Sequence, residues 1–178
     1  MTGFKHLLDR VEFFESDDIS AGFLNNRPIA ALWEYWQSKR GSEPVLRKSD
    51  IDPIELRFGL GHLVMLERLA DGDFVYRLFG SLLAEIAGFD MTGLCVSNFK
   101  GLVAQYHRGT YERCIERGRP IYTLHRAESQ CNGRVWERLL LPLGDHAGVL
   151  KYVMAMVLPA KQPAEMAARL NQRLAAVG

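Results

Sequence analysis

Cysteine is scarce in this chain of 178 residues, which contains Cys95, Cys114 and Cys131 at spacings of 19 and 17. An odd number at these spacings excludes a disulfide framework and fits reduced thiols in a reducing compartment. Structural zinc sites need Cys or His residues at short, regular spacing. No such pair is present, because the histidines are scattered: His6, His62, His107, His125 and His146.

Long apolar runs and blocks of like charge are also missing. The best apolar run, Val153–Leu158, is flanked by Lys151 and Lys161, whereas a membrane span needs roughly 18–20 apolar residues. The first ten residues lack a secretory signal pattern. The 22 basic and 21 acidic residues leave a net charge of +1, which excludes a nucleic-acid or membrane partner held mainly by charge. We expect a cytoplasmic protein without a transmembrane segment and without a nucleic-acid partner.

The composition that is present is that of one globular domain: 48% of residues are hydrophobic, 24% charged and 10% aromatic. A chain of this length buries roughly 70% of its unfolded surface, so its core needs no disulfide or metal.

Helical periodicity marks both ends of the chain. We expect an amphipathic helix over residues 4–14, a polar linker to residue 27, and a helix from Pro28 to Gly41. A last amphipathic helix follows Pro163. The chain then divides into residues 1–27, a domain over residues 28–160, and residues 161–178.

Strand patterns fill most of the remainder. Runs rich in β-branched and aromatic residues predict strands over 62–69, 74–79, 121–126, 135–141 and 149–158, the first two joined as a hairpin at Asp71-Gly72. Between these groups we expect helices over 53–56, 82–87 and 102–118. This order predicts an α+β fold, in which a five-stranded antiparallel sheet is covered on one face by the inserted helices.

Six short motifs narrow this fold assignment to one family. In order they are Trp33-x-x-Trp36-x-x-x-Arg40-Gly41, Leu46-Arg47-x-x-Asp50-Ile51-Asp52-Pro53, Tyr76-Arg77-Leu78-Phe79-Gly80-Ser81, Gly88-Phe89-Asp90-Met91-Thr92-Gly93, Gly118-Arg119-Pro120 and Leu140-Leu141-Pro142-Leu143. Together they resemble the single-domain bacterial PAS-like proteins once grouped as a domain of unknown function, over residues 28–158.

The resemblance implies a stand-alone sensory or regulatory module, typical of alphaproteobacteria, that signals through a protein partner and is not an enzyme. Helices that flank PAS domains commonly mediate dimerisation, so it also implies a homodimer. The apolar side chains of the terminal helices and two tryptophans are the interface candidates: Phe4, Leu7, Leu8, Val11, Phe14, Trp33, Trp36, Met166, Leu170, Leu174 and Val177.

A PAS-like fold encloses its largest space between sheet and helices, where a small ligand can bind. Our candidate lining residues come from the strands and central helices: Leu66, Tyr76, Leu78, Leu83, Ile86, Tyr106, His107, Tyr122, Leu124, Trp136 and Leu140. Arg77, Arg126 and Arg138 also lie on predicted strands. Any that points inward could bind a carboxylate through two hydrogen bonds, although an outward, solvated position is the simpler expectation.

Cofactor and catalytic patterns are weak. His107 is the candidate for a haem ligand, but a lone histidine on a helix is more often structural. Cys95 lies in Leu94-Cys95-Val96-Ser97-Asn98, which lacks the Asn-Cys-Arg-Phe-Leu-Gln-like motif of flavin-binding photoreceptors. Cys114 is seven residues from His107, about 10.5 Å along a helix, too far for a nucleophile and its base. We therefore expect no cofactor and no catalysis.

The leading hypothesis is a sensor of a small apolar or carboxylate-bearing molecule that acts on a partner through its flanking helices. The alternative is a constitutive protein–protein adaptor with a filled core and no metabolite ligand.

Overall fold

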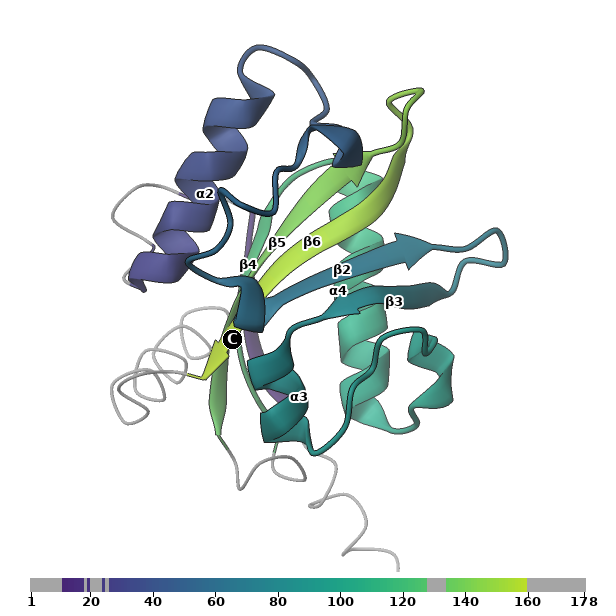
Figure 1. The fold of residues 1–178 in the computed structure, drawn as a ribbon. Helices are drawn as coiled ribbons and strands as arrows, with labels where there is room; N and C mark the ends of the chain where they lie inside the picture. Colours follow the sequence, from purple (N-terminus) through teal and green to yellow (C-terminus); the bar gives the residue numbers. More distant parts are fainter. Residues whose placement is uncertain (1–10, 18, 20–23, 25, 128–133, 160–178) are drawn as a thin grey trace, which may run out of the picture.

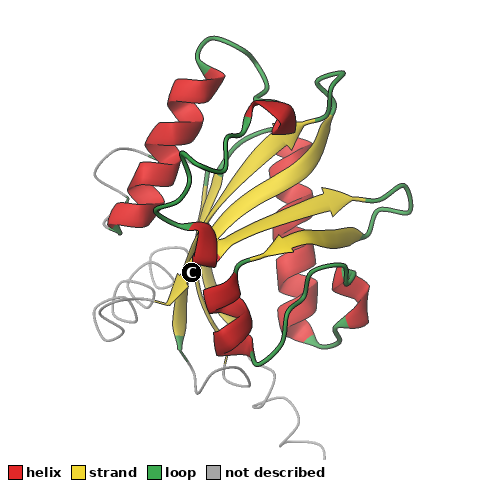
Figure 2. Ribbon diagram, viewed as in Figure 1, coloured by secondary structure: helices red, strands yellow, loops and turns green. Residues whose placement is uncertain are grey.

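A computed structural model describes residues 11–17, 19, 24, 26–127 and 134–159 of the chain. Its centre is a six-stranded sheet (Figures 1 and 2). Along the chain the strands are β1 (Val11–Ser16), β2 (Leu63–Arg68), β3 (Phe74–Phe79), β4 (Ile121–Ala127), β5 (Val135–Gly144) and β6 (Leu150–Pro159). They lie in the order β1-β4-β5-β6-β2-β3, and every pair of neighbours is antiparallel.

In the described part of the chain, three α-helices pack on this sheet: α2 (Arg27–Arg40), α3 (Ser81–Ala87) and α4 (Leu102–Arg117). Short 3₁₀ turns are η1 (Lys48–Asp50), η2 (Leu60–His62) and η3 (Val96–Asn98). Pro28 lies in the first turn of α2, where its missing N–H costs nothing. Gly88 and Gly118 follow α3 and α4 with φ of 82° and 59°, the left-handed conformation that ends a helix.

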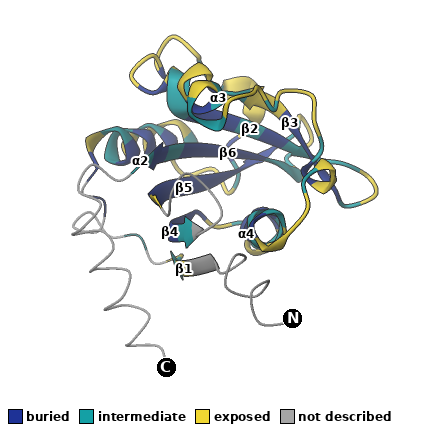
Figure 3. Cartoon of the chain, turned by 90° about the horizontal axis from the view of Figure 1, so that it is seen from below, coloured by how far each residue is buried: buried dark blue, intermediate teal, exposed yellow. Residues whose placement is uncertain are grey.

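The sheet is covered on both faces. Helix α2 lies on one face and α4 on the other (Figures 1 and 3), and β5 between them is buried along all ten residues. Two separate apolar clusters result. The first joins Ile29, Leu32 and Trp36 of α2 to the sheet, and the second joins Tyr111, Cys114 and Ile115 of α4 to the opposite side. We call these the α2 face and the α4 face.

Strand register decides which side chains reach which face. Thr123 lies opposite Arg138, and His125 lies opposite Trp136, so these four residues share the α4 face. Tyr122 and Leu124, one position away, pack in the cluster on the α2 face. Side chains alternate along each strand, so β4 and β5 contribute to both clusters.

Four of the five predicted strands have both ends within two residues of the observed ends. The fifth, predicted over 135–141, extends to Gly144. The hairpin at Asp71-Gly72 is confirmed, with the Leu69 amide donating to the Asp73 carbonyl at 2.8 Å. The predicted helix over 53–56 is wrong. That segment consists of turns closed by short-range hydrogen bonds such as Leu56 N–H to Pro53 C=O.

The predicted helix over residues 4–14 is wrong where the structure describes it, because Val11–Ser16 form β1 and pair with β4. Phe13 contacts Tyr106 on the α4 face, with ring centroids 4.7 Å apart, whereas Phe14 packs toward the α2 face. Neighbouring apolar side chains that point to opposite faces are typical of a strand with both faces packed against other parts of the protein. The sheet therefore has six strands rather than five, and helices cover two faces rather than one.

The two tryptophans proposed for an interface pack within the chain. Trp36 is buried on the α2 face, and Trp33 stacks on it with centroids 5.5 Å apart. The side chain of Val11 and all of Phe4, Leu7, Leu8, Met166, Leu170, Leu174 and Val177 lie outside the described residues. The proposed domain boundaries stay a prediction.

Candidate functional site

A cavity of about 640 Å³ lies on the α4 face, between the sheet and the segment that runs from α3 through η3 to α4. This volume is within the roughly 300–1,000 Å³ typical of cavities that take small organic ligands. Much of its wall is apolar and comes from β3, α3 and the following loop: Phe79, Leu83, Ile86, Phe89, Met91 and Phe99.

Arg138 of β5 borders the cavity and is only 1% exposed. Its Nε donates to Thr123 Oγ1 at 3.0 Å, which fixes the side chain against β4. Its guanidinium carbon lies 5.1 Å from the ring centroid of Tyr106 and 6.0 Å from that of Tyr111. Both terminal nitrogens, Nη1 and Nη2, are buried without a hydrogen-bond partner. A buried charge normally requires an opposite charge or a full set of hydrogen bonds.

Two histidines border the cavity beside this arginine. The Nε2 atoms of His107 on α4 and His125 on β4 are 3.4 Å apart, so one ring donates to the other. Burial lowers the pKa of both rings well below the ordinary value, and the Arg138 charge lowers each further. At neutral pH the pair is therefore uncharged.

Tyrosines complete the polar side of the cavity. Burial raises the pKa of Tyr76 well above its usual value, as does its hydrogen bond with Tyr111, so Tyr76 stays protonated. Tyr106 does not border the cavity; its ring packs against Arg138, and its buried hydroxyl group has no hydrogen-bond partner. Arg138, the two histidines and Tyr111 thus gather on the side of the cavity formed by β4, β5 and α4, and Tyr76 adds a hydroxyl group from β3.

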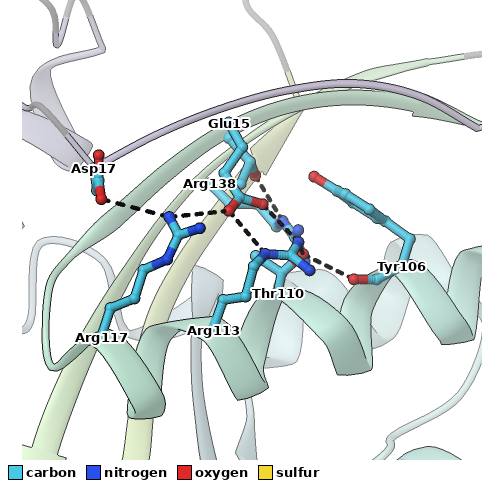
Figure 4. A network of polar contacts seen from close by, with 8 residues as sticks. Glu15, Asp17, Tyr106, Thr110, Arg113, Arg117 and Arg138 are labelled. Carbon is cyan, nitrogen blue, oxygen red and sulfur yellow. Dashed lines mark hydrogen bonds and ion pairs between the residues drawn. The ribbon is translucent and has the colours of Figure 1, made fainter.

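A second polar network holds β1 against α4 (Figure 4). Glu15 accepts two hydrogen bonds from Arg113, from Nε at 2.9 Å and from Nη2 at 2.7 Å. Arg117 reaches both Glu15, at 4.0 Å, and Asp17, at 3.4 Å. The negative charge of Glu15 is thereby balanced by two arginines of α4. Glu15 lies on β1, directly opposite Thr123 of β4.

Five of the predicted lining residues border the cavity: Tyr76, Leu83, Ile86, His107 and Trp136. Leu66 and Leu140 are buried in the cluster on the α4 face, and Tyr106 lies beside Arg138. Tyr122 and Leu124 pack on the α2 face, and Leu78 is 43% exposed. None of these six residues borders the cavity, and the strand positions of the last three point away from it. Ligand binding by the other residues stays a prediction.

The two polar residues most distinctive of the cavity, Arg138 and His125, were not among the lining candidates. The signal for Arg138 was available, since Trp136 and Leu140 were assigned inward and the residue between them must share their face. No such signal existed for His125, because Tyr122 and Leu124 were the candidates on β4, and alternation then places His125 on the opposite face. Of the other two strand arginines, Arg77 is exposed and pairs with Glu67 at 2.7 Å, and Arg126 is partly buried.

The cysteines of the described segments do not border the cavity. Cys95 is partly buried outside it, and Cys114 is fully buried, which raises the pKa of its thiol. Neither of these two thiols is therefore in contact with the space that a small molecule would occupy in this cavity. His107 faces the cavity as a haem ligand would, but its Nε2 is engaged by His125. Among the described residues, no three His, Cys, Asp or Glu side chains cluster as a metal site would require.

No helix in the part of the chain that the structure describes is long and apolar enough to cross a membrane.

A family model described as PAS domain matches residues 24–170. No curated protein matches the chain. Among solved structures, an RNA-binding light-oxygen-voltage receptor is 15% identical, with a TM-score of 0.44, over 95% of this chain and 43% of its own. The dark structure of the blue-light photoreceptor Aureochrome1 LOV is 12% identical over 74% of this chain and 99% of its own, with a TM-score of 0.48.

The light-state dimer of the fungal blue-light photoreceptor Vivid is 14% identical over 71% of this chain and 92% of its own, with a TM-score of 0.41. At these identities and TM-scores, nothing about light, RNA or assembly is carried over from these proteins to this chain.

Proposed function

The chain belongs to the PAS domain family, and on that premise we propose that it is a sensory module that binds a small organic molecule and signals through a protein partner. The family match supports a sensory or regulatory role. The molecule binds in the cavity on the α4 face, and catalysis is not part of the role.

The observation that carries this proposal is the cavity itself. It combines an apolar wall with a few convergent polar groups, the composition typical of small-molecule sites. The alternative, a constitutive adaptor with a filled core, is less well supported because the α4 face holds a cavity of about 640 Å³.

The position of the cavity offers a route for the signal. Residues that border it lie on β3, α3, α4, β4, β5 and β6, so an occupied cavity changes the packing of α4 on the sheet. Helix α4 holds β1 through Arg113 and Glu15. The strand nearest the N-terminus is thus linked to the cavity, and β6 ends where residues 160–178 begin. Cytoplasmic location and dimerisation through the terminal segments stay predictions.

Native mass spectrometry of protein purified from its own cytoplasm tests this function. We expect a mass excess of one small organic molecule per subunit. Adding the extracted molecule at a hundredfold excess over its Kd should stabilise the protein by about 2.7 kcal/mol. An unliganded mass, together with no shift in Tm on adding cell metabolite extracts, would favour the adaptor. An absorption spectrum of the same sample, without a Soret or flavin band, checks the expectation of no cofactor.

A further inference from the structure

The starting point is the guanidinium group of Arg138. It is buried at the wall of the cavity, and Nε is already used by Thr123. The two remaining nitrogens, Nη1 and Nη2, form the end of the guanidinium group and have no hydrogen-bond partner. This pair of donors matches the two oxygens of a carboxylate.

The protein supplies no opposite charge to Arg138 in the part of the chain that the structure describes. None of the described residues that border the cavity is Asp or Glu. Glu15 is held by Arg113 and Arg117. Glu137, the neighbour of Arg138 along β5, points to the α2 face, where Tyr122 and Asn26 donate to it at 2.8 Å and 3.1 Å. The aromatic rings near the guanidinium offset only part of the cost of burying a charge.

The surroundings of Arg138 favour a single negative charge on the ligand. His107 and His125 are uncharged and share one hydrogen bond, so they add no positive charge. Lys100, the other lysine or arginine among the described residues that border the cavity, is exposed. Away from the arginine the wall is built from Phe79, Leu83 and Phe99, which favour an apolar body.

Resting on the proposed function, we infer that the ligand is an organic monocarboxylate with an apolar body. Its carboxylate accepts hydrogen bonds from Nη1 and Nη2 of Arg138, and its body lies between α3 and α4. Arg138 is the residue that determines specificity for the charge.

Pairs of an acid and its primary amide have nearly the same shape but differ in charge, so they isolate the contribution of the carboxylate charge to binding. We would measure binding by calorimetry and by Tm for 4-phenylbutyrate, decanoate and indole-3-acetate, each beside its primary amide. For at least one pair, the acid should bind the wild-type protein at least tenfold more tightly than the amide. In Arg138→Met, the affinity for that acid should fall to the affinity for the amide. The affinity for the amide should change less than threefold between wild type and variant.

Two controls keep the result interpretable. Arg77→Met removes a strand arginine that is exposed and paired with Glu67, and should leave both affinities unchanged. Arg138→Lys keeps the charge but loses the paired donors, and should retain part of the preference for the acid. Circular dichroism checks that each variant folds. A ligand-free Arg138→Met protein should have a Tm no lower than wild type, because an uncompensated buried charge has been removed.

Equal affinity for acid and amide, or an unchanged acid affinity in Arg138→Met, would overturn the carboxylate inference while leaving small-molecule sensing intact. The same holds if native mass spectrometry identifies a neutral or cationic ligand. Failure of every probe to bind would also overturn the inference as stated. The native mass measurement, which uses no added probe, then decides the proposed function separately.

Discussion

At the scale of single residues, the His107–His125 pair has a clear consequence for pH. Burial is the main cause that lowers the pKa of both rings, and the positive charge of Arg138 adds to it. The other groups that face the pair are the rings of Tyr106 and Tyr111. In the unfolded chain both histidines bind protons near pH 6.5, whereas in the folded protein they do not.

The free energy of unfolding should therefore be fully retained above about pH 6.5 and should fall as the pH drops below it. The slope approaches about 1.4 kcal/mol per pH unit for each histidine. Urea unfolding at pH 7.5, 6.5 and 5.5 measures this slope. The double variant His107→Gln, His125→Gln should flatten it, whereas His146→Gln, an exposed position, should not. An equally steep slope in the double variant would show that other groups cause the dependence.

Residue placement also shows where sequence reasoning stops. Apolar residues such as Leu83 and Ile86 could be assigned to the cavity because their helical spacing fixes their side. On β4 the choice between two faces was wrong, since Tyr122 and Leu124 look more like core residues than Thr123 and His125 do. Both faces of this strand are in fact buried, so polarity does not distinguish them. The contact between His107 and His125 arises only from tertiary packing.

At the scale of elements, the junction between β3 and α3 depends on a close backbone contact. Gly80 donates its N–H to the Leu63 carbonyl at 2.8 Å. A Cβ atom at this position would press on the carbonyl group of Gly61 and lie 2.9 Å from the amide nitrogen of His62. Backbone atoms cannot rotate away as a side chain does, so the segment itself must move.

Gly80→Ala should therefore lower the free energy of unfolding by about 1–3 kcal/mol. Gly88→Ala is the matched control at the other end of α3. It has open space around it but a φ of 82°, so it should cost about 1 kcal/mol. Chemical denaturation of the two variants measures the difference. A cost at Gly80 no larger than at Gly88 would contradict the close contact.

Element prediction succeeded where local signals agree and failed where they do not. The β3 boundaries match because a run rich in aromatic and aliphatic residues ends at Gly80. Residues 11–14 were assigned to a helix because Phe4, Leu7, Leu8, Val11 and Phe14 recur at helical spacing. The pairing of β1 with β4 joins segments more than 100 residues apart, and no local pattern reports such a contact.

At the scale of the whole molecule, dimerisation through the C-terminal segment is a prediction from sequence alone. The double variant Leu170→Asp, Leu174→Asp places charge in the predicted apolar stripe and should raise the dimer dissociation constant at least a hundredfold. Light scattering after gel filtration measures the mass. Arg169→Ala with Arg173→Ala changes two basic residues that flank the predicted apolar stripe, and should leave the mass unchanged. A dimer that survives the leucine changes would exclude this segment from the interface.

The two-faced sheet has a consequence for how this protein can be redesigned. Positions 123, 125, 136 and 138 face the cavity side, while 122, 124, 137 and 139 support the packing of α2. On β4 and β5, residues that face the cavity side therefore alternate with residues that hold α2 on the sheet. A library that varies only the first set could alter which molecule is recognised while keeping the scaffold on the other side of the sheet constant.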